Sequence, residues 1–228
     1  MGLSYSVSVP VRTGAERATL ARRTYSLVFL SVVVTMLGTG FALGQPALLD
    51  AVYHHWIIAF LCVLAPLILV MRAPREFPRN IVLTLLFTFV EGIFIAPLMA
   101  LYSAKFPGQH VVEQAAALTL GAFGILTLYA VFSRRDFSAW GSFFSVGLWV
   151  LIATSFLNVF FKSSLASVWL SAGTLFVFSG LLVFDTWRIV RSGAYGEDDY
   201  VAAAVNIYLD LLNMFVAILN LLSGGRRS

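Results

Sequence analysis

The stretch that decides the fold is residues 183–215, VFDTWRIVRSGAYGEDDYVAAAVNIYLDLLNMF. It consists of two apolar segments joined by a short polar turn, and each segment carries one aspartate, Asp185 or Asp210. The midpoint between these positions falls between Glu197 and Asp198, inside the turn. Because two antiparallel helices rise equally from their turn, we expect the two carboxylates to lie at a similar depth and close together.

The composition of the whole chain agrees with a membrane protein. Its 228 residues are 60% apolar and only 11% charged, whereas a soluble domain carries about 25% charged residues. The net charge of +4 is spread over short clusters between apolar segments. No basic stripe and no base-stacking module is evident, so we predict no nucleic-acid partner.

Seven apolar segments have the length of a membrane span, about 20 residues each. The sequence therefore predicts an all-α polytopic membrane protein built as a seven-helix bundle. We expect a cytoplasmic N-terminal arm (1–23), a transmembrane domain (24–222) and a C-terminal tail (223–228). The predicted spans are 24–43, 52–71, 81–102, 111–132, 137–160, 165–187 and 200–222.

The distribution of basic residues predicts the orientation. Eleven of the fifteen Lys and Arg residues fall in the N-terminal arm and in the second-to-third, fourth-to-fifth and sixth-to-seventh connections. Basic residues favour the cytoplasmic side, so the N-terminus should be cytoplasmic. Arg226 and Arg227 in the tail oppose this bias. Seven crossings are favoured, and the alternative is a last helix that does not fully cross.

Apart from Glu113 at the edge of a span, three acidic residues lie within the predicted spans: Glu91, Asp185 and Asp210. A carboxylate at membrane depth costs at least about 2.5–3.5 kcal/mol, so each should face the bundle interior or water. Glu91 is followed in its helix by the flexible Gly92 and the kinking Pro97. It either lines a water path or bonds a neighbouring helix.

The last predicted helix carries a polar strip. Asn206, Asp210, Asn213 and Asn220 follow helical spacing and share one face. This face should turn away from lipid, and its amides are expected to serve as donors beside the acid.

A close pair of carboxylates in a low-dielectric setting cannot readily ionise twice, so it holds a shared proton. The same oxygens suit Ca²⁺, which would compete with that proton. Asp185 and Asp210 are therefore a candidate pH sensor and Ca²⁺ site. Two simpler interpretations stay open. Asp185 precedes Arg188 by one helical turn and can form an ordinary ion pair, and Asp210 can be a structural, hydrogen-bonded acid.

The C-terminal stretch resembles the signature of the transmembrane Bax-inhibitor-motif family. That signature has a D-T-Q-x-I-like element, a short polar turn and a D-Y-h-x-A-A-L-x-L-Y-L-D-h-h-N-L-F element, where h is apolar. The matching residues are Asp185, Thr186, Ile189, Asp199, Tyr200, Tyr208, Leu209, Asp210, Asn213 and Phe215. The segments SRRDFSAWGSF (133–143) and FTFVEGIFIAP (87–97) are also similar to family segments, so the resemblance covers nearly the whole chain.

The resemblance implies a seven-helix bundle with the last helix at its centre. It also implies a pH-sensitive Ca²⁺ leak across the bacterial inner membrane, with Asp185 and Asp210 as the sensor. An arginine at the end of the second helix would latch onto this pair, and Arg72 is the better match, with Arg75 the weaker one. The chain departs from the family at Trp187, where Gln is frequent.

The resulting hypothesis is a pH-sensitive cation (Ca²⁺) leak channel in the lipid bilayer. It would not be an enzyme and would need no cofactor, with Ca²⁺ and protons as its ligands. The alternative is a non-conducting regulator that binds other membrane proteins, such as a quality-control protease or a cell-death partner. A proton-coupled transporter also stays open.

Two further interpretations are disfavoured. An intramembrane aspartyl protease would also use two membrane aspartates, but the glycine context typical of such enzymes is missing here. Asp50, His54 and His55 are a poor metal site, since adjacent histidines on a helix diverge by about 100°.

Overall fold

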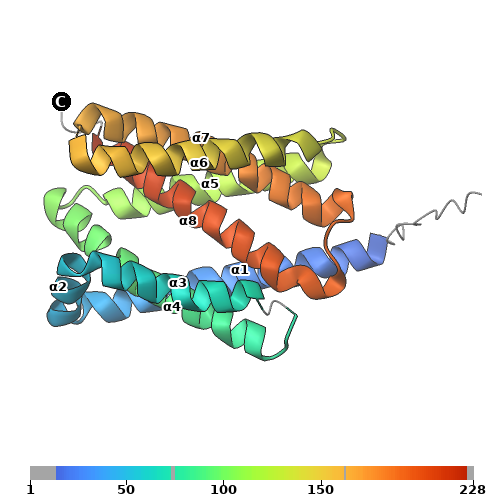
Figure 1. Cartoon of the computed structure of the whole chain (residues 1–228), viewed down its shortest axis with the longest axis horizontal. Coiled ribbons are helices and arrows are strands. Elements are labelled where there is room, and N and C mark those ends of the chain that lie inside the picture. Colours follow the sequence, from blue (N-terminus) through green and yellow to red (C-terminus); the bar gives the residue numbers. More distant parts are fainter. Residues whose placement is uncertain (1–13, 73–74, 162, 225–228) are drawn as a thin grey trace, which may run out of the picture.

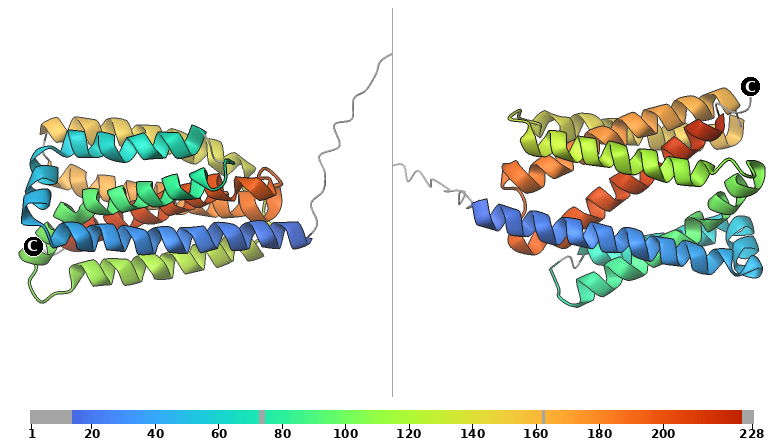
Figure 2. Two further views of the ribbon diagram at one scale, coloured as in Figure 1. Left: turned by 90° about the horizontal axis from the view of Figure 1, so that it is seen from below. Right: turned by 180° about the vertical axis from the view of Figure 1, so that it is seen from behind.

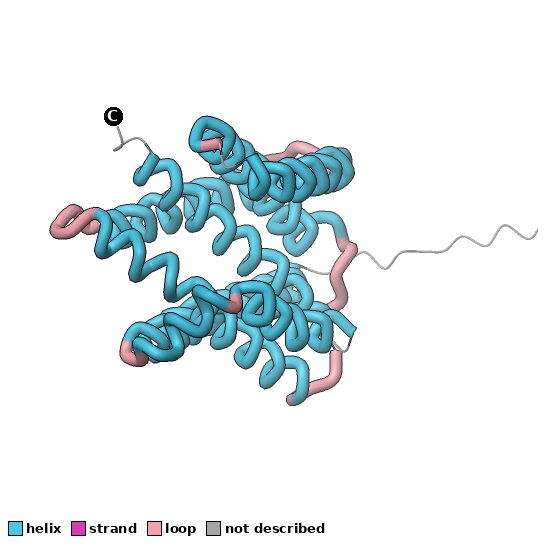
Figure 3. The backbone as a smooth tube through the Cα atoms, turned by 60° about the vertical axis from the view of Figure 1, so that its left-hand side comes forward, coloured by secondary structure: helices cyan, strands magenta, loops and turns pink. Residues whose placement is uncertain are grey.

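The computed structural model describes residues 14–72, 75–161 and 163–224, and these residues form helices joined by short loops, with no strand among them (Figures 1 and 3). Six helices are long and apolar enough to cross a membrane, or seven if a bent pair counts as one span. The protein is thus an all-α polytopic membrane protein. Its elements are α1 (Gly14–Leu43), α2 (Pro46–His54), α3 (Trp56–Arg72), α4 (Arg79–Lys105), α5 (Val111–Phe132), α6 (Ser138–Phe161), α7 (Ser164–Trp187), the π-helical turn η1 (Arg188–Ser192), the 3-10 turn η2 (Glu197–Asp199) and α8 (Tyr200–Gly224).

The second predicted span, 52–71, is not one continuous helix. The chain bends by 95° between α2 and α3, at His55, whose backbone N–H donates to Ala51 O and ends α2. α2 lies across one end of the bundle and α3 runs along it beside α4 (Figure 1). The polar Asp50, His54 and His55 are exposed around this bend. The bend therefore keeps them at the end of the bundle instead of carrying them into it.

The first helix is longer than predicted. α1 begins at Gly14, ten residues before the expected span, so part of the predicted N-terminal arm is helical. Its 30 residues correspond to about 45 Å, more than the roughly 30 Å thickness of the hydrocarbon region. The remainder of the arm (1–13) and residues 225–228 of the predicted tail lie outside the described residues.

α8 occupies the centre of the fold. It crosses diagonally between the group α1–α4 and the group α5–α7 (Figures 1 and 2) and contacts α7, α1, α5 and α4. Its best membrane-spanning window is 61% buried, against at most 33% for the other five candidate spans. The central position expected for the last helix is confirmed.

The start of α1 and the end of α8 lie at opposite ends of the bundle (Figures 1 and 2). This placement agrees with an odd number of passes and so favours seven crossings. The start of α1 shares its end with the α3–α4, α5–α6 and α7–α8 connections (Figure 1). These segments hold most of the Lys and Arg residues, and we call this the basic end; α2 lies at the opposite end.

α1 packs closely on α4 and is also tied to α8. Gly38 and Gly92 lie where a side chain on either would clash with the backbone of the other helix, and Thr39 Oγ1 donates to Gly92 O at 2.9 Å. Thr35 Oγ1 and the Tyr208 hydroxyl are hydrogen-bonded at 2.8 Å, both in the buried core. These contacts fix α1 and α4 against the central helix.

Candidate functional site

The structure brings the two aspartates of the last hairpin together in the interior. Asp185 on α7 is 8% exposed and Asp210 on α8 is 4% exposed. They are close enough for their charges to interact. Equal rise from the α7–α8 connection, with both side chains turned inward, accounts for this arrangement.

Asp185 has a cation beside it. Arg188 Nη1 donates to Asp185 Oδ1 at 3.3 Å, at the point where α7 passes into η1. The guanidinium also lies 4.4 Å from the centre of the Tyr195 ring and 5.4 Å from that of Phe184. The intrahelical ion pair considered from the sequence is therefore present, and two aromatic rings hold its cation in place.

Asp210 has no such support. Its Oδ2 atom is buried and accepts no hydrogen bond from any described residue. The expectation that the neighbouring amides serve as its donors is wrong. Asn206 Nδ2 donates instead to the Tyr195 hydroxyl at 3.1 Å, and Asn213 Nδ2 donates to Leu209 O of its own helix at 2.8 Å. The alternative in which Asp210 is a structural, hydrogen-bonded acid is therefore not supported at Oδ2.

Two tyrosines that the sequence reasoning missed complete the surroundings of the pair. The Tyr25 hydroxyl on α1 is hydrogen-bonded to Thr186 Oγ1 at 2.9 Å, next to Asp185. Tyr195 links Arg188 to Asn206, and burial raises the pKa of its phenol, which keeps it neutral. The available signal for Tyr195 was one large aromatic residue in a turn of small and polar residues.

The two candidate latch arginines lie elsewhere. Arg72 is exposed at the end of α3 and forms no ion pair with a described residue. Arg75 binds Asp199 at the start of α8 through two contacts, Nε to Oδ1 at 2.7 Å and Nη2 to Oδ2 at 3.0 Å. The cation at Asp185 is thus Arg188, and a latch role for Arg72 stays a prediction.

Glu91 lines a cavity of about 600 Å³ between α2, α3, α4 and α8. Trp56 and Tyr53 place this cavity toward the α2 end, opposite the α7–α8 connection (Figure 1). Glu91 makes no ion pair or hydrogen bond within the described part of the chain. This favours the interpretation that it lines a water path over the one in which it bonds a neighbouring helix. Asn213 also lines the cavity. Asp210, one helical turn before it on α8, does not.

A resident metal centre is not evident in this arrangement. The described residues include no group of three or more His, Cys, Asp and Glu side chains that could hold a metal ion. Near the α2–α3 bend, His54 Nδ1 lies 3.1 Å from Asp50 Oδ1, and both side chains are largely exposed. The aspartate pair provides buried carboxylate oxygens at membrane depth, which can hold a proton or interact with a passing cation.

The fold and the site define a class: a polytopic helical membrane protein with two buried carboxylates on its last helical hairpin. The chain belongs to the Bax inhibitor-1 family, since the family model described as "Inhibitor of apoptosis-promoting Bax1" matches residues 17–228.

Relatives from distant organisms align over most of their length. The chain is 32% identical to Bax inhibitor 1 of Schizosaccharomyces pombe, over 94% of this chain and 80% of that protein. It is 30% identical to the Golgi anti-apoptotic protein of Vaccinia virus (strain Lister), over 96% of this chain and 91% of that protein. It is also 30% identical to an uncharacterized membrane protein of Vibrio cholerae serotype O1, over 91% of this chain and 90% of that protein.

Proposed function

We propose that this protein is a pH-sensitive cation leak channel that passes Ca²⁺ and is gated by the Asp185–Asp210 pair. The observation that carries the proposal is the placement of Asp210. Its carboxyl group is buried beside a second carboxylate, and its Oδ2 has no hydrogen-bond partner among the described residues. A charged carboxylate in such a place is costly, whereas a protonated one is tolerated.

The proton of the pair is assigned to Asp210. Arg188 compensates the charge of Asp185, while the neighbouring Tyr25 and Tyr195 are neutral phenols and contribute no positive charge. Loss of the shared proton leaves two negative charges facing one cation. Their repulsion would push α7 and α8 apart, because like charges interact strongly in a low-dielectric interior.

The cavity at the α2 end supports a cation path. It reaches α8 at Leu209, which precedes Asp210, and at Asn213, one helical turn from Asp210, and Glu91 gives it an acidic lining. Ca²⁺ takes six to eight oxygen ligands, more than these carboxylates provide, so it would pass with water as a permeant ion. In this proposal the basic end is cytoplasmic, in the bacterial inner membrane, and the protein is neither an enzyme nor dependent on a cofactor.

Reconstituted Ca²⁺ flux tests the proposal. The purified protein is placed in liposomes that contain a Ca²⁺ indicator, and flux is measured between about pH 6 and pH 8, where a shared carboxylate proton is released. Asp210→Asn and Asp185→Asn should each flatten the pH response. Asp198→Asn, which changes an exposed acid of the α7–α8 connection, is the matched control and should leave it unchanged. Unaltered flux and pH profile in both pair variants would remove the pair from the mechanism.

A second candidate is a non-conducting regulator that binds other membrane proteins. It is favoured by the names of two relatives, a Bax inhibitor and an anti-apoptotic protein. A regulator would retain its co-purifying partners in Asp185→Asn and Asp210→Asn and would show no flux above empty liposomes. A proton-coupled transporter would instead show a fixed ratio of protons to Ca²⁺ in the same vesicles.

A further inference from the structure

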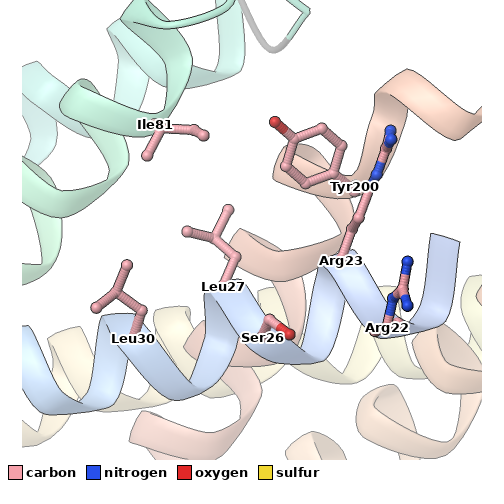
Figure 4. Close-up of a pocket in the computed structure, with 7 residues that line it drawn as sticks. All are labelled: Arg22, Arg23, Ser26, Leu27, Leu30, Ile81 and Tyr200. Carbon is pink, nitrogen blue, oxygen red and sulfur yellow. The ribbon is translucent and has the colours of Figure 1, made fainter. Parts of the chain in front are cut away.

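A groove of about 370 Å³ lies at the basic end, where α1 meets the starts of α4 and α8. Its polar lining consists of Arg22, Arg23 and Ser26 of α1 and Tyr200 of α8. Its apolar lining consists of Leu27, Leu30 and Ile81 (Figure 4). This groove is separate from the aspartate pair and from the cavity that Glu91 lines.

The two arginines bring positive charge that no described carboxylate compensates with an ion pair. Both are exposed, and neither forms an ion pair with a described carboxylate. Arg23 lies over the Tyr200 ring, with 5.9 Å from Cζ to the ring centre. The acid next to Tyr200, Asp199, forms an ion pair with Arg75.

The order of chemical groups along the groove follows the order of groups in a lipid. Arg22 and Arg23 lie at one end, and the aliphatic side chains of Leu27 and Leu30 continue along α1 from there (Figure 4). From Arg23 to Leu30 the helix rises by about 10 Å. α1 is longer than the hydrocarbon region, and arginines favour the boundary while leucines favour the interior, so we expect Arg22 and Arg23 near the membrane boundary and Leu27 and Leu30 inside it.

We propose that this groove binds an anionic phospholipid. The lipid phosphate would accept hydrogen bonds from the guanidinium groups of Arg22 and Arg23, which suit phosphate geometry. The first part of an acyl chain would pack on Leu27, Leu30 and Ile81. A bound lipid would bridge α1, α4 and the start of α8. The proposal does not depend on ion conduction and stands apart from the proposed function.

Native mass spectrometry of the full chain in detergent tests it. Phosphatidylglycerol and phosphatidylcholine with identical acyl chains are titrated separately, and the apparent dissociation constants are compared. The wild type should bind phosphatidylglycerol more tightly. Each arginine near a membrane surface contributes about fivefold to affinity for anionic lipid. The double variant Arg22→Gln/Arg23→Gln should therefore bind phosphatidylglycerol on the order of 30-fold more weakly.

The matched control is Arg134→Gln/Arg135→Gln, which removes two exposed arginines from the α5–α6 connection at the same end. It should retain wild-type affinity, and an equal loss would overturn the proposal in favour of diffuse surface electrostatics. Leu30→Gln, which keeps both arginines, should also weaken phosphatidylglycerol binding, and unchanged affinity in this variant would speak against the acyl contact.

Two competitors separate the lipid from other sources of negative charge. Inorganic phosphate at millimolar concentration should not displace phosphatidylglycerol, because it lacks the acyl chain; full displacement would reduce the site to an anion site and overturn the lipid assignment. An acidic peptide that displaces phosphatidylglycerol from the wild type would overturn it in favour of a protein partner.

Discussion

Arg188 Nη1 lies 3.3 Å from Asp185 Oδ1, one turn along the chain, where α7 passes into η1. The second acid of the pair, Asp210, has no cation of its own among the described residues, and its Oδ2 has no donor. The two carboxylates are therefore inequivalent although they lie in one hairpin. Arg188 stabilises the charge of one, and only a proton can stabilise the other in so buried a place.

Replacement of Arg188 should shift the pH response of the protein. Arg188→Gln removes the cation that contacts Asp185, so the doubly ionised pair becomes less stable and the midpoint of Ca²⁺ flux should move to higher pH, by about one unit. The direction holds whichever protonation state conducts, because the variant changes only the free energy of proton release. Flux in liposomes as a function of pH is the measurement.

The control for this variant is Arg191→Gln. Arg191 lies in the same turn but donates to Val131 O at 3.0 Å, away from the pair. The pH midpoint of Ca²⁺ flux in Arg191→Gln should equal that of the wild type. A midpoint that moves to lower pH in Arg188→Gln, or an equal shift in both variants, would contradict the assignment of Arg188 as the counter-ion of Asp185.

Glu91 should influence the size of the flux. Glu91→Gln removes an ionisable acid from the wall of the 600 Å³ cavity, so cation enrichment by its carboxylate form is lost and Ca²⁺ flux should fall about tenfold at low ionic strength. Glu113→Gln is the control, since Glu113 is exposed near the start of α5 and does not line the cavity. A wild-type flux in Glu91→Gln would exclude this cavity from the path.

The close approach of α1 and α4 should not tolerate a side chain at Gly92. In Gly92→Ala the new Cβ would clash with the carbonyl oxygen of Thr35, and such overpacking typically costs about 1–3 kcal/mol. Gly40→Ala is the matched control, because no atom lies within 4 Å of a Cβ at that position. Thermal unfolding in detergent should show a lower midpoint for Gly92→Ala alone, and equal midpoints would show that the two helices separate easily.

The hydrogen bond between Thr35 and Tyr208 should couple α1 to the central helix. Tyr208→Phe removes one partner and Thr35→Val the other, and interhelical hydrogen bonds of this kind contribute about 0.6–1 kcal/mol in membrane proteins. A double-mutant cycle of unfolding free energies should therefore give a coupling of that size. Additive effects of the two single variants would mean that the 2.8 Å contact adds nothing to stability.

The sequence predicted the helical class of the fold and most of its spans because hydropathy is a local property. A run of about 20 apolar residues must cross or lie within a membrane whatever surrounds it. The proximity of Asp185 and Asp210 also followed from the sequence, since equal rise from one turn sets their relative depth and cost in lipid turns both inward.

The bend at His55 could not be read from hydropathy. Residues 52–71 are apolar enough for one span, yet the chain turns by 95° within them. Whether such a segment continues straight depends on how the helix ends against its neighbours, here on α4 and on the end of the bundle.

What only the tertiary structure decided is which polar groups meet. Asn206 shares a helix face with Asp210 yet binds Tyr195, and Arg75 reaches Asp199 across 124 positions of the chain. Helical spacing places a side chain on a face, but the rotation and separation of packed helices determine its partner. For that reason the sequence identified the two acids, whereas the structure showed which of them is compensated.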